Sequence, residues 1–225
     1  MTDHGSTVRR LILASGSPRR RELISLLGLP FIIRSSNVDE RQLDGELPAD
    51  MVVRLSRVKA ESIGDVRHDE LVIAADTVVA LDGQVLGKPV GPDEATHMLR
   101  LLRGRLHNVY SGICAWHPAS GRLVSELSNS AVWMRDYTDD EIARYVDSGD
   151  PLDKAGAYAI QHPGFDPVTR VEGCWLSVMG FPLCHLGRAL AQFGVALNPG
   201  APGVCRVFSQ RDCPVLPLSQ HQAVS

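Results

Sequence analysis

The 225-residue sequence predicts an α/β fold built on a mixed sheet, and three observations predict it. Apolar runs typical of strands alternate with amphipathic stripes typical of helices. The run 71–75 (LVIAA) has the composition of a strand buried on both faces. Asp82-Gly83 separates the strand-like runs 78–81 and 84–86, which predicts a tight hairpin and therefore some antiparallel pairing.

The chain opens with a strand, a turn and a helix. Residues 10–14 (RLILA) are expected to form a short buried strand, followed by a turn over Ser15–Pro18. A helix is predicted from Pro18 to Leu27, because proline at the first helical position and glycine just past the end (Gly28) are typical of helix termini. Residues 31–33 (FII) form the second expected strand.

The central elements follow in order. Residues 38–40 lie in a loop, and a helix is expected over 48–63, where apolar residues recur at helical spacing. The next helix, over 93–103, has acidic residues in its first turn and arginine in its last, which complements the helix dipole. Strands are expected over 107–116 and 122–134, on either side of a turn.

The C-terminal part is expected to hold two further helices. Thr138 to Glu141 (TDDE) forms a capping box that opens a short helix, and the last helix runs over 182–193. From Asn198 onward proline, glycine, serine and glutamine dominate, which predicts a flexible tail over 198–225. Residues 8–197 would then form a single domain.

Composition and charge exclude several classes of function. With 23 Lys+Arg, 26 Asp+Glu and a net charge of −3, the chain lacks the basic excess of a nucleic-acid-binding protein. It contains no apolar stretch long enough to span a membrane, and its polar N-terminus is unlike a signal peptide. The five cysteines are widely spaced without a C-x-x-C pair, so we expect buried free thiols in a cytoplasmic protein.

A turn rich in small residues leads into an unusually basic helix start. Arg19, Arg20 and Arg21 stand in the first turn, where cations are unfavourable because the helix N-terminus already carries partial positive charge. A bound anion would account for them, since backbone N–H groups, the hydroxyls of Ser15 and Ser17 and the arginine side chains can converge on phosphate. The alternative is a solvated basic helix end.

Carboxylates and lone lysines complete a candidate phosphate site. Asp76 comes directly after the expected buried strand, where a carboxylate would point into the ligand crevice of an α/β sheet, although it could simply cap a turn. Glu40 follows another strand, and Lys59 and Lys88 could contact phosphate oxygens. Carboxylates beside substrate phosphates suit Mg²⁺. These residues favour an enzyme acting on a phosphate ester or nucleotide by metal-assisted attack on phosphorus.

Six motifs then carry a family resemblance: Leu13–Leu23 (LASGSPRRREL), Val38–Glu40 (VDE), Arg57–Ala60 (RVKA), Ala75–Thr77 (ADT), Gly87–Pro89 (GKP) and Pro151–Gln161 (PLDKAGAYAIQ). Together they resemble the Maf family of nucleoside triphosphate pyrophosphatases. The resemblance implies an elongated mixed sheet with flanking helices, two lobes around a central cleft, and a cytoplasmic homodimer. It also implies hydrolysis between the α and β phosphates with a divalent metal, Mg or Mn, as cofactor.

The resemblance assigns roles residue by residue. Asp76 matches the proton acceptor for the attacking water, and Glu40 matches a carboxylate of the metal or water site, so these two would hold the metal. Arg20, Lys59 and Lys88 match phosphate-contacting cations. We therefore expect Asp76, Glu40, Lys59 and Lys88 to be catalytic, with a nucleoside triphosphate as the partner molecule.

Three further positions mark substrate choice within the family. Arg19, Thr77 and Gln161 resemble the branch that acts on dTTP and UTP, whereas the branch that acts on 7-methyl-GTP tends to carry Trp, Gln and Glu there. A glutamine amide can both donate and accept hydrogen bonds toward a pyrimidine. Two alternatives stay open, namely hydrolysis of a broader range of nucleotides and a nucleotide-binding regulator of septum formation.

Overall fold

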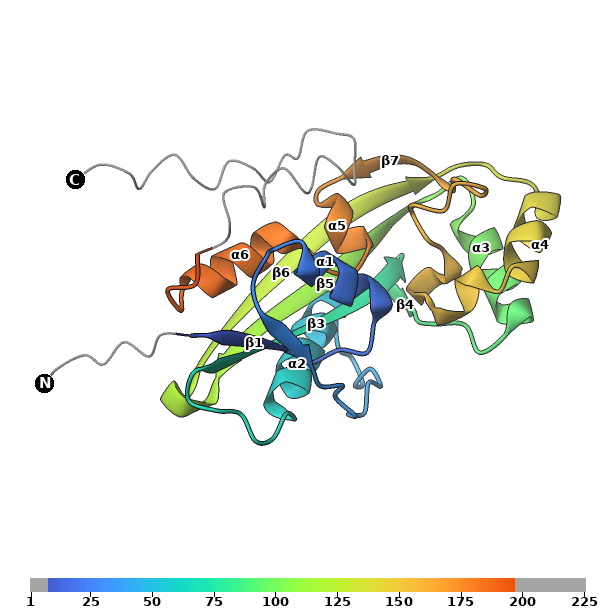
Figure 1. Ribbon diagram of the computed structural model, residues 1–225. Helices are drawn as coiled ribbons and strands as arrows, with labels where there is room; N and C mark the ends of the chain where they lie inside the picture. The colour runs from blue at the N-terminus through green and yellow to red at the C-terminus, as the bar shows by residue number, and fades with distance from the viewer. Residues whose placement is uncertain (1–7, 197–225) are drawn as a thin grey trace, which may run out of the picture.

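The computed structural model describes residues 8–196, and in them seven strands form one mixed sheet (Figure 1). The strands are β1 (Arg10–Leu13), β2 (Phe31–Ile33), β3 (Glu70–Leu81), β4 (Gln84–Leu86), β5 (Leu106–His117), β6 (Arg122–Met134) and β7 (Val168–Glu172). Their order across the sheet is β2-β1-β3-β5-β6-β7, with β4 also paired to β3. β1 runs parallel to β2 and β3, and the other pairs are antiparallel. The predicted α/β class with a mixed sheet is confirmed.

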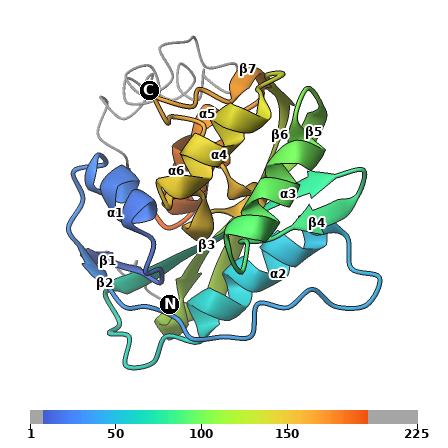
Figure 2. The ribbon, with the colours of Figure 1, turned by 90° about the vertical axis from the view of Figure 1, so that its right-hand side faces the viewer.

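Helices flank this sheet on both faces. The α-helices are α1 (Pro18–Ser25), α2 (Pro48–Glu61), α3 (Pro92–Leu102), α4 (Asp139–Asp147), α5 (Trp175–Val178) and α6 (Leu183–Ala191). Three short 3₁₀ helices are η1 (Pro118–Ser120), η2 (Asp150–Asp153) and η3 (Ala155–Ala157). The molecule is elongated along β5 and β6, and α3 and α4 lie at the end far from β1 (Figures 1 and 2).

Alternate side chains of β3 enter two different cores. Leu71, Ile73 and Val79 belong to the large core that also contains buried residues of α1, α3, α4 and α6. Val72 and Val78 point to the opposite face, where the buried residues of α2 cover the sheet. Because successive residues of a strand face opposite sides, two neighbours on β3 must serve different faces of the molecule.

One edge of β3 is interrupted between two short partners. β1 pairs with residues 70–73 and β4 with residues 79–81. β5 pairs with residues 72–80 along the opposite edge of β3, so β1 and β4 must lie on the same edge as each other. Residues 74–78 therefore have no strand beside them on this edge within the described part of the chain. The sheet has a gap there.

This geometry corrects one prediction. Asp76 was expected at the end of a strand, but it lies in the middle of the continuous strand β3, which extends through Thr77 to Leu81. The apolar run ends at Ala75, yet β5 continues beside β3 and keeps the polar residues in the sheet. The parallel partner strand β1 ends near Asp76, so the carboxylate still lies at the gap in the sheet.

The helix-end and turn signals are otherwise confirmed. Asp82 and Gly83 both have positive φ, 51° and 83°, as a type I′ hairpin turn requires. Thr138 and Glu141 form the capping box that begins α4. The helices end one or two residues earlier than predicted. β7 and α5 were not predicted, because β7 is short, carries charges and lies at the edge of the sheet.

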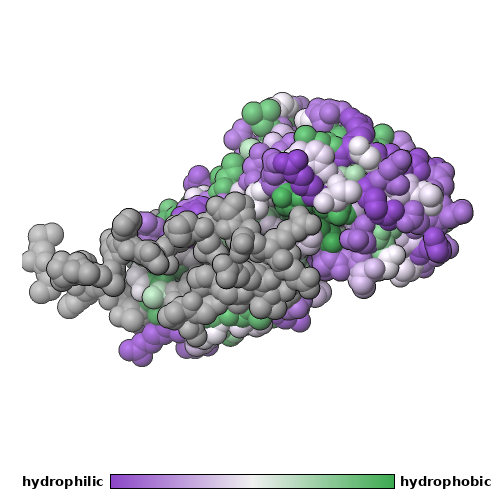
Figure 3. Space-filling model, turned by 90° about the horizontal axis from the view of Figure 1, so that it is seen from above, coloured by the Kyte–Doolittle hydropathy of each residue, from purple (hydrophilic) through white to green (hydrophobic). Residues whose placement is uncertain are grey.

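The structure tests some of the predictions made from composition. Cys114, Cys174 and Cys184 are buried, as expected. No helix among the described residues is long and apolar enough to cross a membrane. The described surface visible in Figure 3 is mainly hydrophilic, with hydrophobic residues in small groups. The predicted flexible tail over 198–225 lies outside the described residues.

Candidate active site

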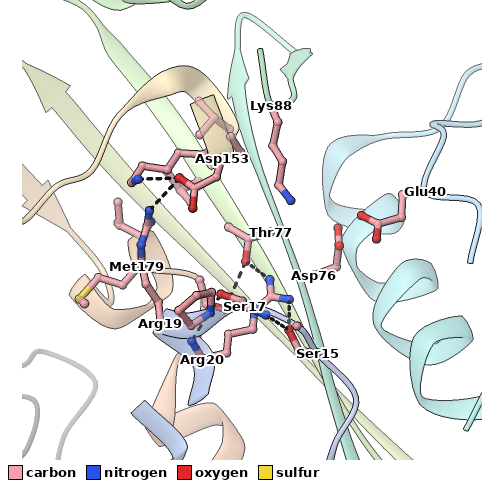
Figure 4. Close-up of a pocket in the computed structure, with 18 of the residues that line it drawn as sticks. Ser15, Ser17, Arg19, Arg20, Glu40, Asp76, Thr77, Lys88, Asp153 and Met179 are labelled. Carbon is pink, nitrogen blue, oxygen red and sulfur yellow. Dashed lines mark hydrogen bonds and ion pairs between the residues drawn. The ribbon is translucent and has the colours of Figure 1, made fainter. Parts of the chain in front are cut away.

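A pocket with a volume of about 520 Å³ lies at the gap in the sheet (Figure 4). All ten site residues singled out in the sequence line it, although they span the chain from the first turn to the segment after η3. They are Ser15, Ser17, Arg19, Arg20, Glu40, Lys59, Asp76, Thr77, Lys88 and Gln161. The structure therefore brings the predicted residues together in one place.

A buried lysine joins two carboxylates on the α2 side of the pocket. Lys59 Nζ lies 2.5 Å from Asp76 Oδ1 and 2.9 Å from Glu40 Oε1. The side chains of Lys59 and Asp76 are each 7% exposed, whereas that of Glu40 is 56% exposed. Asp76 and Glu40 come from different segments but lie near each other in Figure 4. The result is a compact cluster of alternating charge, closed on one side and open to the pocket on the other.

Burial changes the proton affinity of Asp76. Removal of the carboxyl from water raises its pKa above the usual value, while the nearby positive charges of Lys59 and Arg20 oppose the rise. A carboxylate with a raised pKa is a stronger base than an exposed one. Asp76 is thus suited to accept a proton.

Helix α2 can place Lys59 beside Asp76 because the sheet has a glycine beneath the helix. Gly112 of β5 is the cross-strand partner of Asp76 and shares its face of the sheet. A Cβ at Gly112 would lie 2.3 Å from the backbone oxygen of Val52 in α2. Since Lys59 follows Val52 by seven residues, about two helical turns, both lie on the side of α2 that faces the sheet.

The opposite wall is the turn between β1 and α1. Ser17 caps α1 through its hydroxyl, which accepts from the backbone N–H of Arg20 at 3.5 Å. The hydroxyl of Ser15 accepts from the backbone N–H of Ser17 at 3.3 Å. These contacts fix the turn as a concave wall of the pocket that carries two hydroxyls.

The guanidinium of Arg20 is largely engaged with the protein itself. It donates to the carbonyls of Ala75 (2.7 Å) and Gly180 (2.9 Å). It also donates to Ser15 Oγ at 3.4 Å and Thr77 Oγ1 at 3.3 Å. These four contacts occupy four of the five N–H donors of an arginine. The sequence predicted a phosphate contact, but the geometry shows chiefly a cation that joins α1, β3 and the segment before α6 across the gap.

Lys88 stands on the opposite rim of the pocket, just after β4 (Figure 4). Its side chain is exposed and makes no ion pair with any described residue, so its ammonium is available to a ligand. The preceding residue is anchored, because the carbonyl of Gly87 accepts from the backbone N–H of Gly156 at 3.0 Å.

The remaining wall comes from η2 and η3, and here the sequence reasoning missed several residues. Lys154 is buried, with Nζ 2.6 Å from Asp153 Oδ1 and 3.0 Å from Asp150 Oδ1. Arg19 Nη2 lies 3.7 Å from the same Asp153 oxygen, across the pocket. All these residues line the cavity. The signal for Asp153 and Lys154 was the motif PLDKAGAYAIQ, which Asp150 directly precedes and from which only Gln161 was assigned.

The donor set at the cluster fits a divalent cation shared with a substrate. Lys59 engages one oxygen of Asp76 and one of Glu40, and the second oxygen of each makes no hydrogen bond to a described residue. The part of the chain in the structure has no group of three or more metal-ligating side chains. Two carboxylates fit Mg²⁺ or Mn²⁺ only if phosphates and water supply the other ligands, which is usual for Mg²⁺.

Comparison with known proteins gives a uniform result. A family model described as "Maf-like protein" matches residues 10–193. A dTTP/UTP pyrophosphatase of Pelotomaculum thermopropionicum is 43% identical over 187 residues, which cover 83% of this chain and 98% of the relative. The dTTP/UTP pyrophosphatase of Moorella thermoacetica is 45% identical, covering 83% of this chain and 96% of the relative. That of Hahella chejuensis is 43% identical, covering 88% and 98%.

Proposed function

The chain belongs to the Maf family, and from this we propose that it is a nucleoside triphosphate pyrophosphatase that hydrolyses dTTP and UTP. The products would be the nucleoside monophosphate and pyrophosphate. The observation that carries the proposal is the contact of buried Lys59 with buried Asp76 and with Glu40, in a pocket whose other walls carry hydroxyl, arginine and lysine side chains able to bind phosphate. The relatives named above, each matched over nearly their whole length, support the choice of substrates.

In the proposed reaction a water molecule attacks the α-phosphorus. Asp76 accepts a proton from this water, for which its raised pKa makes it a suitable base. The bond between the α-phosphorus and the oxygen that bridges to the β-phosphate breaks, and that oxygen leaves with pyrophosphate. Lys88 is free to neutralise charge on the departing phosphates, and Lys59 holds Asp76 in place.

A divalent metal is part of the proposal. Glu40 and Asp76 would hold Mg²⁺ or Mn²⁺ through their uncommitted oxygens, and the ion would neutralise phosphate charge when bound. We further propose a cytoplasmic homodimer, on the resemblance to the family. Sedimentation of the purified chain tests the dimer, which predicts a mass of about twice the 24.5 kDa of one chain.

The function is tested by measuring pyrophosphate release from purified protein with Mg²⁺ or Mn²⁺. The substrates are the standard nucleoside triphosphates, 7-methyl-GTP, ITP and 5-methyl-UTP. We expect rapid turnover of dTTP, UTP and 5-methyl-UTP, since the last combines the base of dTTP with the ribose of UTP. We expect little turnover of the others, and none of any substrate after the metal is removed with a chelator.

Other outcomes would change the assignment in defined ways. Activity spread evenly over the panel would keep the chemistry and favour the broader-specificity enzyme. Nucleotide binding without turnover of any substrate would contradict the proposal and favour a nucleotide-binding regulator.

A further inference from the structure

Arg19 differs from Arg20 in that the protein makes little use of its guanidinium. The side chain of Arg19 is 24% exposed, lines the pocket and makes no hydrogen bond to any residue that the structure describes. Its ion pair within residues 8–196 is with Asp153, whose Oδ1 lies 3.7 Å from Nη2, too far for a hydrogen bond. The five N–H donors of this arginine are therefore available to a ligand.

The same oxygen of Asp153 is also held by a buried cation. Lys154, whose side chain is 7% exposed, donates to Asp153 Oδ1 at 2.6 Å. Lys154 Nζ also donates to the backbone carbonyl of Asp150 and lies 3.0 Å from Asp150 Oδ1. Asp150 is fixed from a second side, because its Oδ2 accepts from the hydroxyl of Tyr145 at 2.6 Å. Lys154 thus has a fixed counter-ion besides Asp153.

Asp153 is the member of this group that can move away. Its side chain is 69% exposed, so water can hydrate its carboxylate in another position. Ion pairs at the protein surface contribute only about 0–1 kcal/mol. A phosphate group carries up to two negative charges and can accept two parallel hydrogen bonds from one guanidinium. A phosphate that reaches this point would therefore be a stronger partner for the same two cations than the carboxylate is.

We propose that Arg19 and Lys154 form a phosphate subsite, and that the Asp153 carboxylate occupies this subsite as a displaceable anion while no nucleotide is bound. Arg19 belongs to α1 and Asp153 to η2, so displacement of the carboxylate also releases a contact between two walls of the pocket (Figure 4). This inference rests on the proposed function, whose substrates and products carry phosphate. Because the subsite binds phosphate rather than base, Asp153 should weaken the binding of dTTP and UTP to the same degree.

The test measures dissociation constants for inorganic pyrophosphate, thymidine monophosphate and thymidine, by calorimetry on the full chain without divalent metal. Asp153→Asn removes the competing charge but keeps an oxygen that can accept from Lys154. We expect at least one of the two phosphate ligands to bind about three- to tenfold more tightly than to the wild type, because a charge that would repel the phosphate is removed. The binding of thymidine, which has no phosphate, should not change.

Asp147→Asn is the matched control. Asp147 is exposed and lies outside the pocket, so the same change of net charge should leave all three dissociation constants unchanged. A gain for pyrophosphate would assign the subsite to the phosphates that leave, and a gain for thymidine monophosphate to the phosphate that stays on the nucleoside. Unchanged or weaker binding of both ligands to Asp153→Asn, or an equal gain in Asp147→Asn, would overturn the inference.

Changes at Arg19 provide a second measurement. Arg19→Gln removes one cation of the subsite and should weaken the binding of the same phosphate ligand about tenfold or more, the range of a hydrogen bond to a charged group. Arg21→Gln, at an exposed position outside the pocket, is its control and should keep the wild-type affinity. If Asp153→Asn does not fold, this pair decides the question, and equal affinities in the two variants would overturn the inference.

Failure of the inference can be told apart from failure of the proposed function, because the binding measurements need no turnover. Absence of pyrophosphate release from dTTP and UTP in the wild type would refute the enzyme, but tighter phosphate binding in Asp153→Asn would still support the subsite. In an active enzyme we expect Asp153→Asn to lower KM for dTTP and UTP by the same factor. Turnover with unchanged phosphate affinities in Asp153→Asn would keep the enzyme and refute the inference.

Discussion

At the scale of single residues, the site depends on a carboxylate that the fold keeps out of water. Asp76 interrupts the α2 face of β3, with Ala74 on one side and Val78 on the other, each in a separate hydrophobic cluster. Burying a charge is unfavourable unless it is paired, and Lys59 supplies the pair. A polar residue in this position is costly to stability, which is typical of residues retained for function.

Replacement of Asp76 tests its role as the base. Asp76→Asn keeps the shape of the side chain but cannot accept a proton from water, so we expect pyrophosphate release to fall at least a hundredfold, on the order of a general base contribution. Binding of α,β-methylene-dTTP should be retained. Asp140→Asn, at an exposed position outside the pocket, is the control and should leave turnover unchanged. Unchanged turnover in Asp76→Asn would refute the assigned role.

A buried histidine predicts how stability depends on pH. His107 lies in the core with Nε2 2.8 Å from the hydroxyl of Tyr158, and burial lowers its pKa to about 4. In the unfolded chain its pKa is near 6.5, so between these values the unfolded state binds more protons and stability falls as the pH falls. Urea titrations from pH 7 to pH 4 should show this loss, with a contribution of His107 on the order of 3 kcal/mol.

The comparison of two variants isolates this contribution. His107→Gln cannot gain a proton in this pH range, so its stability should depend less steeply on pH than that of the wild type, even if it is lower overall. His97→Gln, at an exposed position on α3, should keep the wild-type slope. Equal slopes for all three proteins would contradict the prediction.

At the scale of elements, the position of α2 relative to the sheet determines the geometry of the cluster. The helix contacts both β3 and β5, and Gly112 allows its backbone to come closer than a side chain would permit. The packing of Met51, Val52 and Leu55 fixes the near end of the helix on the sheet. Lys59 is carried to Asp76 as a consequence of that packing.

A methyl group at Gly112 should therefore affect catalysis from a distance. Gly112→Ala forces α2 away from the sheet, and we expect a loss of about 1–3 kcal/mol in the free energy of unfolding, typical of overpacking. We also expect a lower kcat as Lys59 withdraws from Asp76. Gly64→Ala is the control, because Gly64 lies just beyond the same helix and a Cβ there meets no atom within 4 Å. Full activity in a folded Gly112→Ala would show that the close approach is not needed.

At the scale of the whole molecule, the two faces of the sheet contribute different parts of the site through the gap. Asp76 and Glu40 lie with α2, whereas Thr77, Arg19 and the η2–η3 segment lie on the other face or rim (Figure 4). Arg20 crosses the gap and joins segments up to 160 positions apart in the sequence. The nucleotide would thus be held by catalytic groups on one side and by selective groups on the other.

The selective groups can be exchanged together. Arg19, Thr77 and Gln161 come from α1, β3 and the segment after η3, and all line the same pocket. Changing them to Trp, Gln and Glu should move the preference from dTTP and UTP toward 7-methyl-GTP, because a glutamate favours the cationic methylated base by charge. The measurement is kcat/KM for all three nucleotides in both proteins. An unchanged order of preference would show that these positions do not set specificity in this chain.

Much of the fold could be predicted from local chemistry. The hairpin at Asp82-Gly83 depends on two positive φ angles, and the capping box at Thr138 depends on contacts within four residues. Such signals act within a single turn and can be read from neighbours in the sequence. β7 was not predicted, because an exposed edge strand needs no alternation of apolar and polar residues. Its position also depends on pairing with β6, more than thirty residues earlier in the sequence.

The sequence by itself determined the α/β class, the places of most helices and strands, and the identity of the ten residues that meet in the pocket. Only the tertiary structure decided that Asp76 lies within a strand at a gap in the sheet, and that the guanidinium of Arg20 donates mainly to groups of the protein itself. The physical reason is the distance along the sequence between the residues whose contacts decide each feature. Helix ends and turns arise from contacts between near neighbours, whereas the edge of a strand and the direction of a hydrogen bond depend on partners supplied by distant parts of the chain.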